Sequence, residues 1–451
     1  MNPSFYLSKL RNSEPLSFRQ QVLLIVFLSV PSIMAQLSSI IMSYIDASMV
    51  GHLGAAEAAS IGLVASSTWL FLGFTFAAAM GFTVQAAQLI GANKEKEARN
   101  LLKIALASTM FFSLVLMAAG ISVSFFLPGW LGGSEEIFRD SWAYFFIFCL
   151  SIPVIQLNDL CAEMLQCSGE MKFPSMMQIL MAVLNIILNY ILIFVMKMGV
   201  VGAALSTLVS RTVVTALLFA FLFFKSPVLS VRKNERMVFD WNVVKNALKI
   251  GLPVAFEQVI MSGGQIAYTR IVSPLGNIPL AANSFGITVE SLCYMPAAGI
   301  GAAASTLCGQ SFGAGRLDLT YRFGWLTAAL GMALMVVTGG LMFVFAPEMI
   351  GLLTPDAEIR ALGSKILRIE SFCEPFYGAS LVINGALRGT GDTLVPSIFK
   401  FASVWFVRIP LALVLAGRYG LEGIWFAMSF ELCVRGILFL FRLWSSSRKS
   451  R

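Results

Sequence analysis

The stretch LQCSGEMKFPS (165–175) recurs as LRGTGDTLVPS (387–397), 222 positions further along the chain. Both copies place a glycine, then an acid, then a Pro-Ser pair at equivalent positions. The same spacing relates four further pairs: Pro31 and Pro253, Gly54 and Gly276, Pro153 and Pro375, and QLIGANKEKEA (88–98) and QSFGAGRLDLT (310–320). One spacing that holds over so much of the chain indicates an internal duplication. The sequence therefore predicts two homologous halves.

The composition of the chain indicates that its solvent is lipid. Of the 451 residues, 57% are hydrophobic and only 12% are charged, and the mean hydropathy is +0.80. In a typical soluble domain, about a quarter of all residues are charged. Continuous apolar runs that are long enough to cross a hydrocarbon core of about 30 Å recur along the chain, and they exclude the alternating strands of a membrane barrel. We expect about twelve transmembrane helices, near 20–45, 57–80, 101–127, 140–162, 174–196, 201–224, 247–270, 279–306, 323–346, 364–386, 395–416 and 421–443.

The number of spans fixes how the halves are related. With six spans in each half, both halves start on the same side of the membrane. We therefore expect an all-α polytopic membrane protein with two pseudo-symmetric six-helix bundles, 1–224 and 250–451, joined by a cytoplasmic linker, 225–249. Parallel repeats of this kind are related by an axis along the membrane normal and place the substrate path at their interface. This arrangement is typical of carriers that work by alternating access.

The positive charges follow the parity of the loops. The formal net charge is +8, and the loops after the second and sixth spans and the chain end are basic. By contrast, SEEIFRD (134–140) is acidic and SPLGNIPL (273–280) is uncharged. The positive-inside rule then places both termini in the cytoplasm. Because the basicity follows the loops and forms no compact basic domain, we expect no nucleic-acid partner.

The sequence lacks the residues of several other kinds of chemistry. It has one histidine, His52, and no Walker A motif, which argues against an enzyme and against ATP hydrolysis as the energy source. The seven cysteines are scattered without a CxxC pair, which indicates neither a disulfide framework nor a zinc site. We expect no resident cofactor and no removable signal peptide.

Asp46 is the main candidate functional residue. It lies in SYIDASMVGHLG (43–54), at the end of the first apolar span. A carboxylate at mid-bilayer costs about 2.5–3.5 kcal/mol. Its counterpart in the second half is Tyr268, so the acid belongs to the first half alone. Two interpretations remain: Asp46 is solvated at the outer end of its helix, or it is a functional site.

Asn185 and Asn189 are candidate partners of Asp46. They are four residues apart and therefore lie on one helix face. Two carboxamide oxygens beside a carboxylate suit a hard cation such as Na⁺, or a proton site, and we expect no other metal site. The alternative role of the two asparagines is hydrogen bonding between helices. Their counterparts, Val407 and Leu411, are apolar, so this polar set also belongs to the first half.

Pro31 is a candidate hinge in the same span, 15 residues before Asp46. A proline inside a helix removes a backbone hydrogen bond and favours a kink. The bend is either static or responds to the charge on Asp46.

Other polar residues within the predicted spans are candidates for a substrate cavity. Carboxylates at such positions bind a cationic substrate or pair with arginines such as Arg270, Arg408 or Arg435, whereas glutamines line a cavity or join helices. The candidates are Gln36, Glu257, Gln265, Tyr268, Glu290 and Glu374.

Several of these motifs resemble the multidrug and toxic compound extrusion (MATE) family. The resemblance rests on IDASMVGHLG (45–54), the paired segments QLIGA and GQSFGAG, YMPAAGIGAAAS (294–305) and NGALRGTGDTLVPS (384–397), and it covers nearly the whole chain. It implies the MATE/MOP fold and an antiporter that exports small organic compounds, often cationic and amphipathic, in exchange for H⁺ or Na⁺. We also expect a monomer in the lipid bilayer of a bacterial cytoplasmic (inner) membrane.

The DinF-like bacterial branch of the family is the most similar one. There, a first-helix Asp, a polar pair on the fifth helix and a Thr on the sixth form the cation site. Matched motif by motif, these are Asp46, Asn185 with Asn189, and Thr207, and the bending proline is Pro31.

The chain also departs from its relatives. Asn189 stands where some relatives carry a second Asp, which suits a proton at least as well as sodium. The helix-ten acid of the NorM-like branch falls on Tyr377, with Glu374 one turn earlier, and Glu257 does not match that branch's helix-seven acid clearly. These departures favour a cation site in the first half. The alternative function is a lipid-linked precursor flippase of the same superfamily, for which we would expect a strongly basic central groove rather than mixed charges.

Overall fold

The computed structural model describes residues 3–12, 14–230, 232, 235 and 237–449, which form helices, turns and loops. The chain divides into two compact units. We call Ser38–Ala255 the N-unit, and Met1–Leu37 together with Phe256–Arg451 the C-unit. Two long helices, α2 (Phe18–Gly51) and α9 (Trp241–Val272), each begin in one unit and end in the other.

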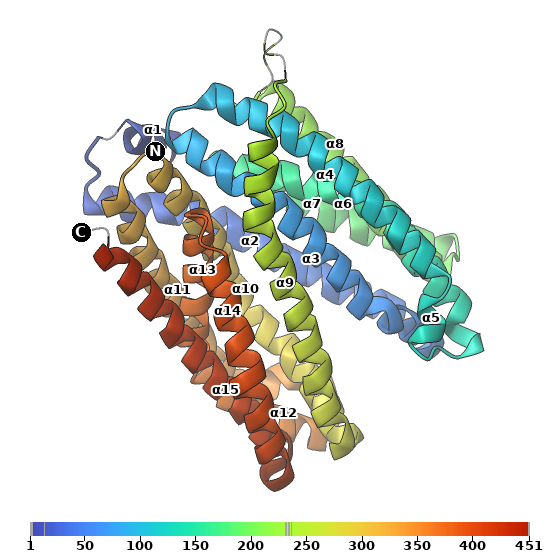
Figure 1. Ribbon diagram of the computed structural model, residues 1–451. Coiled ribbons are helices and arrows are strands. Elements are labelled where there is room, and N and C mark those ends of the chain that lie inside the picture. The colour runs from blue at the N-terminus through green and yellow to red at the C-terminus, as the bar shows by residue number, and fades with distance from the viewer. Residues whose placement is uncertain (1–2, 13, 231, 233–234, 236, 450–451) are drawn as a thin grey trace. The chain divides into compact units, whose positions relative to one another are not determined.

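The N-unit is built around α6 (Glu135–Cys167). This helix packs against α3 (Ala55–Gly91), α4 (Glu95–Ser124) and α8 (Gly199–Phe224) (Figure 1). The remaining elements of the N-unit are the end of α2, α5 (Leu127–Trp130), α7 (Lys172–Asn189), the π-helix η1 (Tyr190–Val195) and the start of α9.

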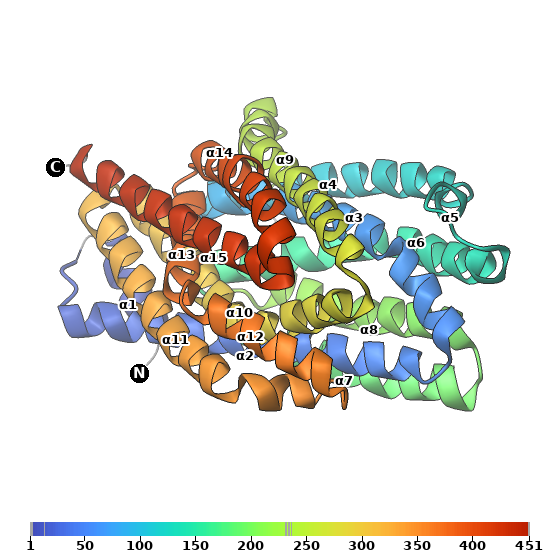
Figure 2. The same ribbon diagram turned by 90° about the horizontal axis from the view of Figure 1, so that it is seen from below.

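The C-unit repeats this arrangement around α13 (Glu374–Gly389). This helix packs against α10 (Asn277–Gly313), α11 (Leu317–Gly351) and α15 (Ile409–Lys449), and Figure 2 shows the group from below. The remaining elements are α1 (Pro3–Arg11), the start of α2, the end of α9, the 3₁₀-helix η2 (Ser273–Leu275), α12 (Ala357–Ser371), α14 (Leu394–Ser403) and the π-helix η3 (Val404–Arg408).

The repeated stretch forms the same turn in both units. Gly169 follows α6 with a φ of 95°, and Gly391 follows α13 with a φ of 87°. In both turns the backbone amide that follows the glycine donates to the carbonyl five residues before that amide: Glu170 to Leu165 and Asp392 to Leu387, each at 3.0 Å. Only glycine adopts a positive φ at little cost, and this bond closes a helix end in the Schellman manner. The duplication predicted from the sequence is thus a duplication of backbone geometry.

The all-helical membrane fold is confirmed, with differences in the spans. Nine helices of the described residues are long and apolar enough to cross a membrane. The last of them, Leu394–Arg448, covers two predicted spans, because its backbone leaves the helical region only at Gly420 (φ 57°, ψ −135°). The predicted single helix 364–386 is wrong: α12 ends at Ser371 and α13 begins at Glu374. Pro375 lies in the first turn of α13, where a proline is tolerated because its missing N–H is not needed for the helix.

The segment that joins the two sequence halves differs in extent from the predicted linker 225–249. It is helical from Trp241, where α9 begins. Its earlier part is attached to α4 of the N-unit, because Arg99 donates to Glu235 at 2.8 Å and to the carbonyl of Val228 at 3.1 Å. The hydrogen bond from Arg99 also lowers the pKa of Glu235 below its usual value. The compact units also differ from the predicted halves 1–224 and 250–451. The first part of α2 belongs to the C-unit, and the first part of α9 belongs to the N-unit.

The first part of α9 lies at close range to α3. A methyl group on Gly81 would lie 2.3 Å from the carbonyl oxygen of Ala247, and one on Gly251 would lie 2.7 Å from that of Ala77. Gln85 of α3 also donates to the carbonyl of Val243 at 3.2 Å. The absence of side chains at the two glycines is what lets the backbones approach.

We therefore expect Gly81→Ala to destabilise the protein by about 1–3 kcal/mol, because the added methyl must push α9 away. A lower melting temperature of the purified protein in detergent would measure this. The matched control is Gly62→Ala in the same helix, where nothing lies within 4 Å of the new methyl. This control should be neutral or slightly stabilising. Equal melting temperatures for the two variants would contradict this packing.

Candidate functional site

Asp46 lies on the last part of α2, in the N-unit, five residues before the helix ends at Gly51. Its side chain is half-buried. Asn189 donates to its Oδ1 at 2.5 Å. The carboxylate is therefore held by a neighbouring helix rather than only solvated at the end of its own.

Both predicted asparagines reach this carboxylate from the end of α7. Asn185 and Asn189 are 0% and 1% exposed, and Asn189 Nδ2 lies 3.2 Å from Asn185 Oδ1. The π-helix η1 begins directly after Asn189. A π-helix is a strained element that recurs at functional sites, so the backbone is irregular beside the candidate site.

The start of α8 closes the site. Thr207 Oγ1 lies 3.1 Å from the side-chain amide of Asn185, which brings the fourth predicted residue into the set. Ser206, which is fully buried, donates to Asn189 Oδ1. Sequence reasoning missed Ser206, although its hydroxyl is adjacent to that of Thr207 in GAALSTLVS (202–210).

The Asn185 amide lies between Asp46 and Thr207. The amide atom that faces the carboxyl lies 2.6 Å from Asp46 Oδ1, and the other amide atom lies 3.1 Å from Thr207 Oγ1. If the nitrogen faces Asp46, it donates to an ionised carboxylate while the oxygen accepts from Thr207. If the oxygen faces Asp46, two oxygens meet at 2.6 Å, which is favourable only when Asp46 carries a proton. A turn of this amide therefore distinguishes the two protonation states.

The same atoms also suit a small cation. One carboxylate, two carboxamides and two hydroxyls supply the hard oxygen ligands that Na⁺ prefers. Among the described residues no group of three or more His, Cys, Asp or Glu side chains is arranged to hold a metal ion.

Pro31 lies in the part of α2 that belongs to the C-unit, and α2 runs through it without a break. Proline removes one backbone hydrogen bond at this point. The side chain of Gln36, five residues on, is half-buried.

Glu257 on α9 is the centre of a buried ion cluster in the C-unit. It lies 3.0 Å from Arg388 and 2.5 Å from Lys400, and Ser397 donates to it at 3.0 Å. These partners differ from the arginines considered from the sequence. Glu257 is therefore a paired charge in this structure.

The other C-unit candidates differ in burial. Glu290, Glu374 and Tyr268 are buried, with exposed fractions of 7%, 0% and 2%, whereas Gln265 is exposed. Within the described residues, the two carboxyl oxygens of Glu374 and the hydroxyl of Tyr268 are buried and form no hydrogen bond of normal distance and angle. Glu374 does lie beside the thiol of Cys293.

A second C-unit ion cluster was not predicted. Glu431 on α15 is fully buried and lies 2.6 Å from Arg408 and 2.7 Å from Arg435. Fully buried Glu370 on α12 accepts from Ser429 at 2.7 Å. The two arginines were singled out in the sequence, but Glu431 was not, although it lies four residues before Arg435 on one helix face.

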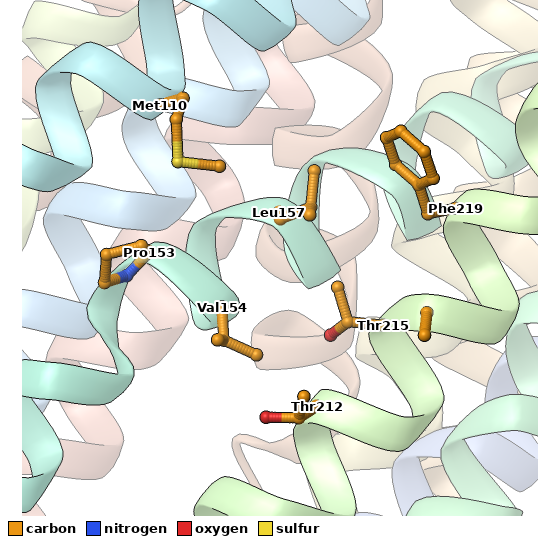
Figure 3. A pocket seen from close by; sticks show the side chains of 8 residues that line it. Met110, Pro153, Val154, Leu157, Thr212, Thr215 and Phe219 are labelled. Atoms are coloured by element: carbon orange, nitrogen blue, oxygen red, sulfur yellow. The ribbon is translucent and has the colours of Figure 1, made fainter.

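The N-unit also carries an apolar groove of about 370 Å³ between α4, α6 and α8 (Figure 3). Met110, Leu157 and Phe219 project into it, and Thr212 and Thr215 contribute the only hydroxyls of its lining. None of the predicted site residues lines this groove.

Comparison with known proteins agrees with the duplication. The MatE family model matches residues 31–191 and 253–414, and the two matched segments begin 222 positions apart. Together they make up more than half of the chain.

Relatives and solved structures cover nearly the whole chain. It is 29% identical to "Probable multidrug resistance protein NorM" of Thermotoga maritima, over 97% of this chain and 95% of the relative. It is 25% identical to "Probable multidrug resistance protein YoeA" of Bacillus subtilis, over 92% and 91%. A structure described as the outward-facing conformation of a multidrug resistance MATE family transporter of the MOP superfamily superposes with a TM-score of 0.92, at 19% identity, over 99% of this chain and 98% of that one. With two family matches, one in each half, the chain belongs to the MatE family of transporters.

Proposed function

We propose that this protein is a cation-coupled antiporter that exports small organic compounds across a bacterial cytoplasmic membrane by alternating access. The observation that carries the proposal is the half-buried carboxylate of Asp46, which accepts from Asn189 and lies 2.6 Å from the amide of Asn185, both asparagines being buried. Such a group within an apolar span is costly and is by default functional. The names of the NorM and YoeA relatives support multidrug export as the direction and the substrate class.

Asp46, Asn185, Asn189 and Thr207 are the coupling site in this proposal. When the external cation, H⁺ or Na⁺, binds at Asp46, the amide of Asn185 turns and the bond between α2 and α7 weakens. The end of α2 then repacks, and Pro31, which lacks one backbone hydrogen bond, is the hinge about which it bends. With a single carboxylate among neutral oxygens, the set suits a proton at least as well as Na⁺.

The C-unit candidates have a secondary place in this proposal. Gln36, Tyr268, Glu290 and Glu374 are proposed to line the substrate cavity, together with the exposed Gln265. Of the C-unit carboxylates proposed for substrate binding, Glu257 is the least available to a cationic substrate, since Arg388 and Lys400 already neutralise it.

The finer assignment is to the DinF-like branch, and its support is that the compact polar site lies in the N-unit. We further propose a monomer with both termini in the cytoplasm, from the basic loops. The alternative, a flippase for a lipid-linked precursor, requires a strongly basic groove. The charges around Glu257 and Glu431 are instead mixed in sign, with each acid bound by two basic side chains.

Transport by the purified protein tests this function. In proteoliposomes loaded with ethidium, an imposed pH gradient should drive dye movement in the absence of sodium, and a sodium gradient at constant pH should drive little. Dye movement driven only by sodium would replace the proton by Na⁺ at the same site. If neither gradient moved ethidium, and fluorescent lipid were translocated instead, the flippase would be the better description.

A further inference from the structure

The segment that leads into α9 exposes apolar side chains, although it lies outside the predicted spans. Val238, Phe239 and Trp241 are 67%, 55% and 64% exposed. The rings of Phe239 and Trp241 lie 6.4 Å apart. Single exposed apolar residues are common on protein surfaces, whereas a contiguous group of them marks an interaction surface.

The backbone of this segment is fixed to α4 of the N-unit. The side-chain amide of Asn100 donates to the carbonyl of Val238 at 2.8 Å, and its oxygen accepts from the backbone amide of Val238 at 2.9 Å. Lys103 donates to the carbonyl of Glu235, and Arg99 binds the carboxylate of the same residue. The exposed side chains therefore project from an ordered backbone, which reduces the entropy that a binding partner must overcome.

Two lysines continue the exposed surface along the first turns of α9. Lys245 and Lys249 are exposed and lie four and eight residues after Trp241, which places all three on one helix face. Neither lysine forms an ion pair with a residue that the structure describes. Asp240, at the start of the helix, accepts from the backbone amide of Asn242 at 2.9 Å. With two lysines and one acid, this part of the surface is positively charged.

The surface lies at the level where neighbouring membrane-spanning helices end. Gln85, which donates to the carbonyl of Val243, is six residues before the end of α3. Asn100 is five residues after the start of α4. At a rise of 1.5 Å per residue, both contacts lie within about 10 Å of a helix end. Trp side chains are enriched at this level of a membrane, and lysines extend from it towards the lipid headgroups.

We propose that Val238, Phe239, Trp241, Lys245 and Lys249 form a binding surface for an anionic phospholipid of the surrounding bilayer. The two ammonium groups bind the charged headgroup, and the apolar side chains contact the first part of the acyl chains. The surface follows the end of α8, whereas the coupling set lies at the start of that helix. The inference therefore goes beyond the proposed function and does not depend on it.

The test compares two lipids that share their acyl chains and differ in headgroup charge: phosphatidylglycerol and phosphatidylcholine, each with a fluorophore on one chain. Their dissociation constants for the purified full-length protein are measured in detergent by fluorescence anisotropy. We expect the wild type to bind phosphatidylglycerol about tenfold more tightly. The double variant Lys245→Gln with Lys249→Gln should weaken phosphatidylglycerol about tenfold and leave phosphatidylcholine unchanged, because phosphatidylcholine has no net charge. Phe239→Ser with Trp241→Ser should weaken both lipids about fivefold, because both use the apolar contact.

Three controls separate lipid recognition from misfolding and from general basicity. Lys245→Arg with Lys249→Arg keeps both charges and should retain most of the preference for phosphatidylglycerol. Lys96→Gln removes an exposed charge from the first turn of α4 and should change neither constant. Inorganic phosphate should not displace the lipid, because it has no acyl chains.

Equal affinities of the wild type for the two lipids would overturn the proposal. An equal loss of phosphatidylglycerol binding in Lys96→Gln and in the Lys245→Gln with Lys249→Gln variant would also overturn it, because basic loops in general would then account for the binding. Failure of the proposed antiport is seen separately, as an absence of gradient-driven dye movement by the wild type.

Discussion

The Asp46→Asn protein should bind dye but lose gradient-driven export, with an efflux rate about 100-fold below that of the wild type. The reason is chemical. An asparagine at position 46 still accepts from the Asn189 amide that lies 2.5 Å from the carboxylate, so α2 and α7 remain joined. It cannot gain or lose a charge, so the amide of Asn185 has only one favourable orientation. The measurement is ethidium efflux from proteoliposomes under an imposed pH gradient.

The control for this variant removes an acid elsewhere. Glu136 is exposed in the first turn of α6, and Glu136→Gln changes the net charge by the same amount without touching the site. It should export at the wild-type rate. Asp46→Asn with full export would refute coupling at Asp46, and a variant that no longer bound dye would point to a structural role instead.

The largest effect on stability is expected for Glu431→Gln. Arg408 and Arg435 both bind Glu431, and their side chains are 12% and 4% exposed. Without the carboxylate, two buried guanidinium groups lose the acid that binds both of them. Breaking a buried ion pair by removing one partner costs about 3–5 kcal/mol. That is a large part of the net stability of about 5–15 kcal/mol of a typical protein.

We expect Glu431→Gln to reduce the yield of monodisperse protein, measured by gel filtration. It should also lower the melting temperature strongly, measured by thermal unfolding. The matched control is Glu422→Gln, which removes the partner of Lys365 from an ion pair in which Glu422 is 41% exposed. An exposed pair contributes about 0–1 kcal/mol, so this variant should be close to the wild type. The double variant Glu431→Gln with Arg435→Gln should recover part of the stability, because it leaves one unpaired charge instead of two. Equal melting temperatures for Glu431→Gln and Glu422→Gln would contradict the structural role of the cluster.

The coupling set shows what the sequence reveals about a site. Asp46 stood out because a carboxylate is rare in an apolar span, and Asn185 with Asn189 because their spacing places them on one helix face. The structure brings these residues together and joins Thr207 to them. That Thr207 faces this site was implied by family resemblance alone, because periodicity within a helix does not show which helix lies opposite.

The ion clusters show the corresponding limit. The sequence contains Glu257, Lys400 and Arg388, but they are far apart in the chain and meet only through packing of α9, α13 and α14. The break between α12 and α13 spans only Phe372 and Cys373, and a hydropathy window averages over so short an interruption.

The two halves have kept the backbone and changed the polar chemistry. The turns at Gly169 and Gly391 retain the same positive φ and the same closing hydrogen bond. Asp46, in contrast, corresponds to Tyr268. Turn geometry must be kept for the helices to pack, whereas a cation site is needed only once.

The central claim, that Asp46 exchanges a cation for substrate, is tested most directly by counting the cation that dye binding displaces. Purified wild-type and Asp46→Asn proteins are titrated with ethidium by calorimetry in two buffers of different ionisation enthalpy, with and without sodium. The wild type should release about one proton for each dye bound, since one carboxylate titrates in the site. Asp46→Asn should bind the dye and release none. The same number of protons released by both proteins would contradict the account.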